Sequence, residues 1–256
     1  MLINLRNALM AGGKPTARDY FSDYGIALWS GIENLGLGEH SNSTSTWFDL
    51  WGHYNLTCNS IGSRWEENGF RFDGTYAFAS SSATIQRDAA RGWTAECVYS
   101  LSASMQDYTG LFGNRCSGRF PGIYGLNYWS GQGGYGCGTA TGYAEDAFTQ
   151  NETPQITSIT SLNTIHSMSL SLSADNVITL YGDGVLIGQK SWSYFPNQYE
   201  IGYMLGRAYS GRINQIFASD STRVFKGKIF CHRLYSRALP EDVVLQNLKI
   251  DRAIYQ

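Results

Sequence analysis

The sequence predicts an all-β fold, an antiparallel β-sandwich. Charged residues make up only 16% of the chain, aromatic residues reach 14%, and there are 29 glycines. This composition is typical of short strands joined by tight turns. Segments in which apolar and polar residues alternate recur along the chain, and helical spacing is confined to a short stretch at each end. A chain of 256 residues is long enough to form a single sandwich with a sizeable core.

The N-terminal residues 1–20 are expected to form an arm, followed by the sandwich domain at 21–256. Three leucines in the arm have helical spacing: Leu2, Leu5 and Leu9. The stretch "AGGKPT" at 11–16 then breaks the helix. Isolated helices below ~12–15 residues are marginal in water, so these leucines need a surface to cover. They could fold back on their own sandwich or dock on another subunit, and the flexible glycine linker favours docking on a partner subunit.

Strands and turns alternate from residue 25 onward. The clearest alternating segments are "GFRFDGTYAFAS" (69–80), "WTAECVYSLS" (93–102) and "IHSMSLSLS" (165–173). In the last of these, the large apolar side chains are expected to fill the core while the serines point outward. In "TLYGDGVLIGQKSW" (179–192), the pair Asp183-Gly184 suits a type I′ turn and predicts a β-hairpin. We interpret Asp183 as a turn residue and not as a ligand-binding carboxylate.

The last segment, at 224–253, begins as a strand and changes to a helical period. Pro240 suits a first helical turn, and Glu241 and Asp242 favour the N-terminal end of a helix dipole. Val244 and Leu248 lie four residues apart, on one helix face. The sequence therefore predicts a short C-terminal helix.

Several phrases of the sequence together resemble the laminin-G-like branch of the concanavalin A-like lectin/glucanase superfamily. In order, they are "GFRFDG", "ITLYGDGVLIGQ", "YMLGR" and "FKGKIFCHRLYSRALPEDV". The stretch at 28–57 is similar to the N-terminal part of bacterial and phage versions. The resemblance implies a two-sheet antiparallel jelly roll, a concanavalin A-like sandwich, with the short arm and the short C-terminal helix added.

The sequence lacks the motifs of familiar enzymes. Related β-glucanases carry closely spaced acids of the form E-x-D-x-x-E on one strand face, and this chain has no such run. Its four histidines are scattered, and neither a G-x-S-x-G nor a phosphate-binding loop occurs. We therefore expect a protein that is not an enzyme, with no catalytic residue, cofactor or metal ligand. A soluble polysaccharide-degrading enzyme of the same fold is the alternative.

Charge, hydropathy and cysteine spacing indicate which partners and which compartment to expect. The formal net charge is −2 and no basic stripe is visible, which argues against nucleic acid. No apolar run approaches the ~20 residues that span a bilayer, and no secretion signal is apparent. The five cysteines lack C-x-x-C spacing, so we interpret them as free thiols of a protein made in a reducing cytoplasm.

The most unusual segment is the glycine-rich, aromatic stretch at 118–143. Its candidate glycan-binding residues are Tyr124, Tyr128, Trp129 and Tyr135. Exposed aromatic rings are platforms for sugar rings, and nearby polar groups can bind the hydroxyls. The alternative is that these rings pack between the sheets while the glycines permit bends.

The function expected from these features is that of a bacteriophage virion protein with a lectin-like domain. A phage structural protein is assembled in the host cytoplasm, which reconciles a lectin-like fold with the missing secretion signal. Such a protein would serve as a tail, fibre or capsid-decoration subunit and attach to host surface glycans. Its partners would be other virion subunits, in a homo-oligomer or a larger assembly. A purely architectural subunit that binds no sugar is a further alternative.

Overall fold

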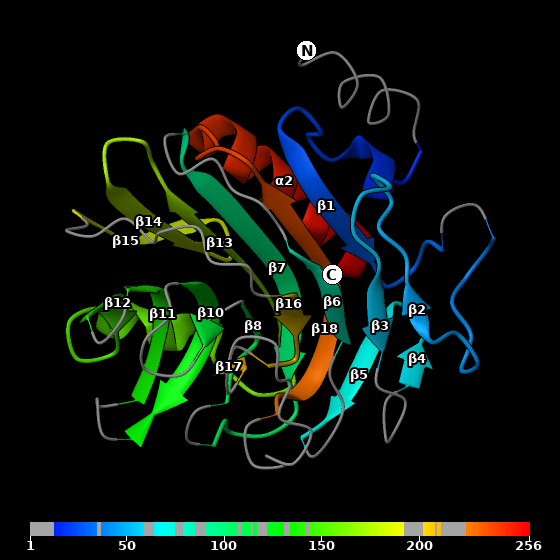
Figure 1. Cartoon of the computed structure of the whole chain (residues 1–256), viewed down its shortest axis with the longest axis horizontal. Helices are drawn as coiled ribbons and strands as arrows, with labels where there is room; N and C mark the ends of the chain where they lie inside the picture. The colour runs from blue at the N-terminus through cyan, green and yellow to red at the C-terminus, as the bar shows by residue number, and fades with distance from the viewer. Residues whose placement is uncertain are drawn as a thin grey trace.

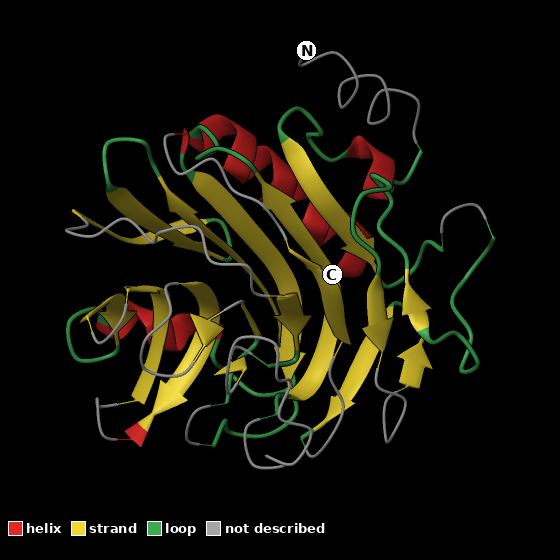
Figure 2. Cartoon of the chain, in the orientation of Figure 1, coloured by secondary structure: helices red, strands yellow, loops and turns green. Residues whose placement is uncertain are grey.

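The computed structural model describes most of the chain from residue 13 to residue 256. The residues left out of that description are 35–36, 59–63, 75–78, 85–90, 107–108, 114, 117–121, 131–133, 142–143, 192–201, 208 and 211–223. Strands dominate the described part, with a single α-helix at its C-terminal end (Figure 2). Within these residues, no helix is long and apolar enough to cross a bilayer.

The first sheet, sheet A, holds eight strands, and all of its neighbouring strands pair antiparallel. Seven follow the order β15 (Val185–Ser191), β14 (Val177–Gly182), β13 (Ile165–Leu172), β7 (Trp93–Leu101), β18 (Lys226–Tyr235), β5 (Gly69–Asp73) and β4 (Arg64–Glu66). The eighth, β1 (Gly25–Ser30), also pairs with β18.

The second sheet, sheet B, also has eight strands in antiparallel pairs. Their order is β12 (Ala144–Thr149), β11 (Gly134–Thr141), β10 (Gly122–Trp129), β8 (Phe112–Gly113), β16 (Gly202–Leu205), β6 (Ala79–Thr84), β3 (Leu56–Cys58) and β2 (Thr46–Trp47). A short parallel pair joins β9 (Arg115–Cys116) to β17 (Tyr209–Ser210). The two large sheets confirm the predicted all-β sandwich (Figure 1).

The main core lies between the two sheets. On β7 the residues at every second position, Ala95, Cys97, Tyr99 and Leu101, belong to this core and are fully buried. Sheet B contributes Phe112, Leu126 and Tyr203 from the opposite side. Fully burying one large apolar side chain contributes ~1.5–3 kcal/mol, so the side chains that strand alternation directs into this core stabilise the fold.

The C-terminal helix α2 (Glu241–Tyr255) forms a third layer on the outer face of sheet A (Figure 1). Its Ile250 packs in one cluster with Val98, and its Leu248 packs in another with Tyr235. The helix also contacts β13. This layer corrects one expectation: the serines of β13 that were predicted to face solvent, such as Ser167 and Ser169, are each only 1% exposed.

The predicted hairpin at 179–192 is formed by β14 and β15, which pair from Val177–Ser191 to Gly182–Val185. Asp183 and Gly184 have φ angles of 50° and 81°. Both values are positive, as a type I′ turn requires.

The last residues of the predicted arm pack on the sandwich itself. A short 3₁₀ turn, η1 (Ala17–Asp19), is capped by Thr16, and the Ala17 N–H donates to Glu33. Ala17 and Tyr20 are buried in the cluster under α2. Residues 1–12, which contain Leu2, Leu5 and Leu9, lie outside the described residues.

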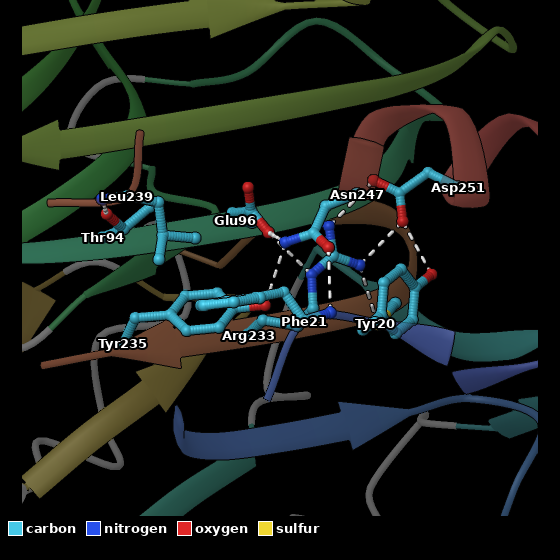
Figure 3. A network of polar contacts seen from close by, with 10 residues as sticks. Tyr20, Phe21, Thr94, Glu96, Arg233, Tyr235, Leu239, Asn247 and Asp251 are labelled. Atoms are coloured by element: carbon cyan, nitrogen blue, oxygen red, sulfur yellow. Dashed lines mark hydrogen bonds and ion pairs between the residues drawn. The ribbon is translucent and has the colours of Figure 1, made fainter. Parts of the chain in front are cut away.

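An ionic cluster ties α2 to the sheet beneath it (Figure 3). Arg233 on β18 donates through Nε to Glu96 Oε2 at 2.9 Å, and through Nη1 and Nη2 to the two carboxylate oxygens of Asp251 at 2.7 and 2.9 Å. Asn247 donates to the same Glu96 oxygen at 2.8 Å, and the Tyr20 hydroxyl donates to Asp251 at 2.7 Å. The guanidinium lies 3.9 Å from the centroid of the Tyr20 ring. These groups are buried, so the cluster anchors the helix and is closed to a ligand.

Candidate functional site

The predicted glycan-binding residues lie on the hairpin formed by β10 and β11. Tyr128 on β10 is directly opposite Tyr135 on β11, and Trp129 is opposite Gly134. Tyr124 is opposite Gly138, beyond a β-bulge. The side chains of Tyr124 and Trp129 lie outside what the structure describes. The hairpin register therefore brings two of the four predicted rings together.

Tyr128 and Tyr135 form an aromatic pair at the border of the core. Their ring centroids lie 5.1 Å apart with the planes at 74°, the edge-to-face geometry that aromatic pairs favour. Both side chains pack against the inter-sheet core and both are only partly buried. Partial burial raises the pKa of the Tyr135 phenol above its ordinary value. Tyr128 and Tyr135 are thus packed against the core and keep part of their surface accessible, an outcome between the two alternatives that the sequence left open.

A polar side chain supports the backbone at this pair. Gln150 Oε1 accepts a hydrogen bond from the Tyr135 N–H at 3.2 Å, and the Gln150 N–H donates to the Tyr135 carbonyl at 2.8 Å. Gly134 has a φ of 120°, and a Cβ there would lie 2.2 Å from Gln150 Oε1, so glycine is what allows the amide to approach. The pair therefore combines aromatic surface with an amide group nearby, the combination that carbohydrate sites use.

A second aromatic assembly lies wholly inside the sandwich. His232 stacks on Trp29 at 5.7 Å and on Tyr203 at 5.4 Å, and its Nε2 is hydrogen-bonded to the Tyr203 hydroxyl at 2.8 Å. Burial holds the pKa of His232 well below its ordinary value of 6.5. The neighbouring Cys231 faces the helix side, in the cluster that contains Ile250. The two adjacent side chains diverge, as strand alternation predicts, and the histidine has a packing role.

Comparisons with known proteins show where this fold occurs. No protein-family model matches the chain, and no curated protein sequence matches it. Among solved structures, a mutant of Trypanosoma rangeli sialidase displaying trans-sialidase activity is similar at a TM-score of 0.61 and 14% identity, over 98% of this chain and 36% of the sialidase chain. The same sialidase in complex with sialic acid is similar at a TM-score of 0.57 and 14% identity, over 94% and 34% of the two chains. The binding domain of botulinum neurotoxin serotype D is similar at a TM-score of 0.58 and 9% identity, over 89% of this chain and 52% of that chain.

These likenesses establish a shared fold. The chain spans about a third of the sialidase chains and about half of the neurotoxin structure that it matches. At identities of 9–14%, no site residue can be carried over from them.

The prediction that the protein is not an enzyme is corrected by this comparison. Sialidases are enzymes, and nearly the whole of this chain superimposes on part of a sialidase chain. The missing E-x-D-x-x-E run rules out one arrangement of glycosidase carboxylates only. Because a fold does not fix a function, neither that missing run nor the sandwich is a ground for excluding catalysis.

Proposed function

We propose that this chain is a glycan-binding module built on a lectin-like β-sandwich. The observation that carries the proposal is the partly buried pair Tyr128 and Tyr135, held edge to face on the β10–β11 hairpin, with Gln150 bonded to the Tyr135 backbone. The accessible part of each aromatic side chain suits C–H contacts with a sugar, and packing against the core keeps the rings in place at little entropic cost.

The fold neighbours support the same class of ligand. One of them is a sialidase in complex with sialic acid, and another is named as the binding domain of a neurotoxin. The net charge of −2 gives no general attraction for an acidic sugar, so recognition would depend on local contacts. A panel of glycans should therefore contain sialylated and neutral members in equal number.

A glycan array followed by titration of the best ligand tests the proposal. Tyr135→Ala and Tyr128→Ala should each weaken binding by ~1–3 kcal/mol, about 5- to 150-fold in Kd. Tyr54→Ala is the matched control, because Tyr54 is also partly buried against the core but precedes β3, near the other end of sheet B. An array without any bound glycan, or an equal loss in the control, would contradict the proposal and favour a purely architectural subunit.

We infer a bacteriophage particle as the setting, with host surface glycans as the target. The support is the likeness of the sequence at 28–57 to phage versions of the fold and the free cysteines. Leu2, Leu5 and Leu9 would dock on a neighbouring virion subunit. Deleting residues 1–12 keeps Tyr20 in its cluster and should leave a folded domain that no longer joins the particle. Mass spectrometry of purified particles, with and without the deletion, tests both parts.

A further inference from the structure

Three polar side chains from separate parts of the chain meet at one end of sheet A. Ser161 follows the 3₁₀ turn η4 (Pro154–Ile159), His166 is the second residue of β13, and Asp183 is in the β14–β15 turn. His166 Nε2 lies 2.8 Å from Ser161 Oγ, and His166 Nδ1 lies 2.7 Å from Asp183 Oδ2. The imidazole therefore bridges a hydroxyl and a carboxylate through its two nitrogens.

The carboxylate settles which nitrogen carries the proton. A carboxylate only accepts hydrogen bonds, so the contact with Asp183 requires a proton on Nδ1, and the tautomer of His166 that carries its proton there presents the Nε2 lone pair to Ser161 Oγ. That tautomer can accept the serine proton. The carbonyl oxygen of Ser161, 3.2 Å from Nε2, can accept a hydrogen bond once Nε2 is protonated.

Asp183 is itself held rigidly in the turn. Its Oδ1 accepts the Ser167 N–H at 2.8 Å, and its own N–H donates to the Ser167 carbonyl at 2.8 Å. The guanidinium of Arg252, on α2, donates to the Asp183 carbonyl. On the other side, the Tyr99 hydroxyl donates to the Ile159 carbonyl at 2.8 Å, which fixes the segment just before Ser161. Both ends of the contact chain are thus positioned by the sandwich.

The three residues differ in their exposure to solvent. The His166 side chain is only 3% exposed and that of Asp183 is 34% exposed, whereas Ser161 is exposed. Ser161 is thus the member of the three that a dissolved molecule can reach, while the imidazole is shielded from water. Exposed apolar residues flank the site in sequence: Leu162 is 44% exposed and Val185 is 66% exposed. Leu162, the residue next to Ser161 in the chain, offers an apolar side chain to a short acyl group.

We propose that Ser161, His166 and Asp183 form a nucleophilic centre that hydrolyses carboxylic esters with short acyl groups. The serine is the nucleophile, the histidine is the general base, and the aspartate is the residue that orients the histidine. This activity goes beyond glycan binding and does not depend on it.

The reaction needs no further reactant than water. Ser161 Oγ forms a bond to the ester carbonyl carbon while its proton moves to His166 Nε2. The tetrahedral intermediate breaks its bond to the alcohol oxygen, which leaves with the proton from Nε2. Water then attacks the acyl-serine, gives a proton to Nε2, and the carboxylic acid departs as Ser161 Oγ regains its proton. Asp183 stays ionised and stabilises the imidazolium in both steps.

The test treats the full chain with a fluorophosphonate probe and with p-nitrophenyl acetate. We expect labelling in the peptide that contains Ser161, located by mass spectrometry, and turnover of the ester. Ser161→Ala should abolish both. Ser158→Ala is the matched control, since Ser158 is an exposed serine on η4, three residues earlier, and its loss should change neither.

Asp183→Asn separates chemistry from structure. Asparagine tolerates the positive φ of this position, so the turn should persist, but the amide no longer selects the productive tautomer. Labelling and turnover should fall at least about 100-fold while circular dichroism stays unchanged. The proposal is overturned if wild-type Ser161 is not labelled, or if its labelling is the same in Asp183→Asn. Either result would mean that these contacts only hold the loop at 160–164 against the turn.

Discussion

Replacing Asp251 by Asn tests whether the ionic cluster holds α2 on sheet A. The carboxylate accepts hydrogen bonds from Arg233 Nη1 at 2.7 Å, from Arg233 Nη2 at 2.9 Å and from the Tyr20 hydroxyl at 2.7 Å. The Arg233 side chain is fully buried, and that of Asp251 is 2% exposed. Asparagine keeps the shape of the side chain but removes its charge, which leaves the guanidinium with less compensation.

The expected cost follows from burial. Removing one partner of a buried ion pair costs roughly 3–5 kcal/mol, because the other charge stays in the interior. Arg233 keeps its bond to Glu96, so we expect about 3–4 kcal/mol, the lower part of this range. In a chain of this size each kcal/mol lowers Tm by ~2–4 °C, which gives a fall of about 6–16 °C.

Urea unfolding followed by circular dichroism, together with thermal melts, measures this loss. Asp242→Asn is the control, because Asp242 is an exposed residue in the first turn of the same helix. Its removal should cost only ~0.3–1 kcal/mol through the helix dipole. A loss below about 1 kcal/mol for Asp251→Asn, the range of a surface pair, would refute the anchoring role.

Three further predictions concern the core. The pKa of His232 is depressed in the folded state, so below pH 6.5 the folded chain binds fewer protons than the unfolded chain. Acidification should therefore lower the free energy of unfolding by up to ~1.4 kcal/mol per pH unit through this residue. Urea unfolding at pH 7 and pH 5 should show a weaker pH dependence in His232→Gln than in the wild type, and an equal pH dependence would contradict this. Gly206→Ala places a Cβ 2.3 Å from the Phe72 ring at a φ of 76° and should lower the free energy of unfolding by roughly 2–4 kcal/mol. Gly52→Ala, at a φ of 85° with open space around it, should lower it by only about 1 kcal/mol. Equal losses of stability in thermal melts would argue against the clash with Phe72. Burial raises the pKa of four thiols, those of Cys58, Cys97, Cys137 and Cys231. In a Cys116→Ser variant, which removes the fifth thiol, Ellman's reagent should therefore modify them only after unfolding, and rapid reaction of that native variant would disprove this.

The sequence alone determined those structural features that depend on residues adjacent in the chain. Alternation specified the strands at 93–101 and 165–172, because side chains of successive residues point to opposite faces. Asp183-Gly184 specified the β14–β15 turn, because few residue pairs adopt two positive φ angles. The C-terminal helix begins at Glu241, directly after Pro240, so the proline and the two acids that follow it placed the start of the helix to within a residue.

Other features depend on which distant segments pack together, and only the tertiary structure decided these. The serines of β13 are buried because α2, about 70 residues later, covers a face that alternation alone would leave to solvent. Arg233 meets Glu96 across 137 positions of sequence.

Asp183 shows both levels in one residue. The glycine that follows Asp183 predicts its role in the turn. Its contact with His166, which in turn contacts Ser161, could not be predicted from the sequence. Alternation along β13 fixes which faces successive residues take, yet whether a hydroxyl and a carboxylate stand beside the imidazole depends on how η4 and the hairpin are packed. Pairing between side chains is a property of packing in space, and spacing along the chain does not encode it.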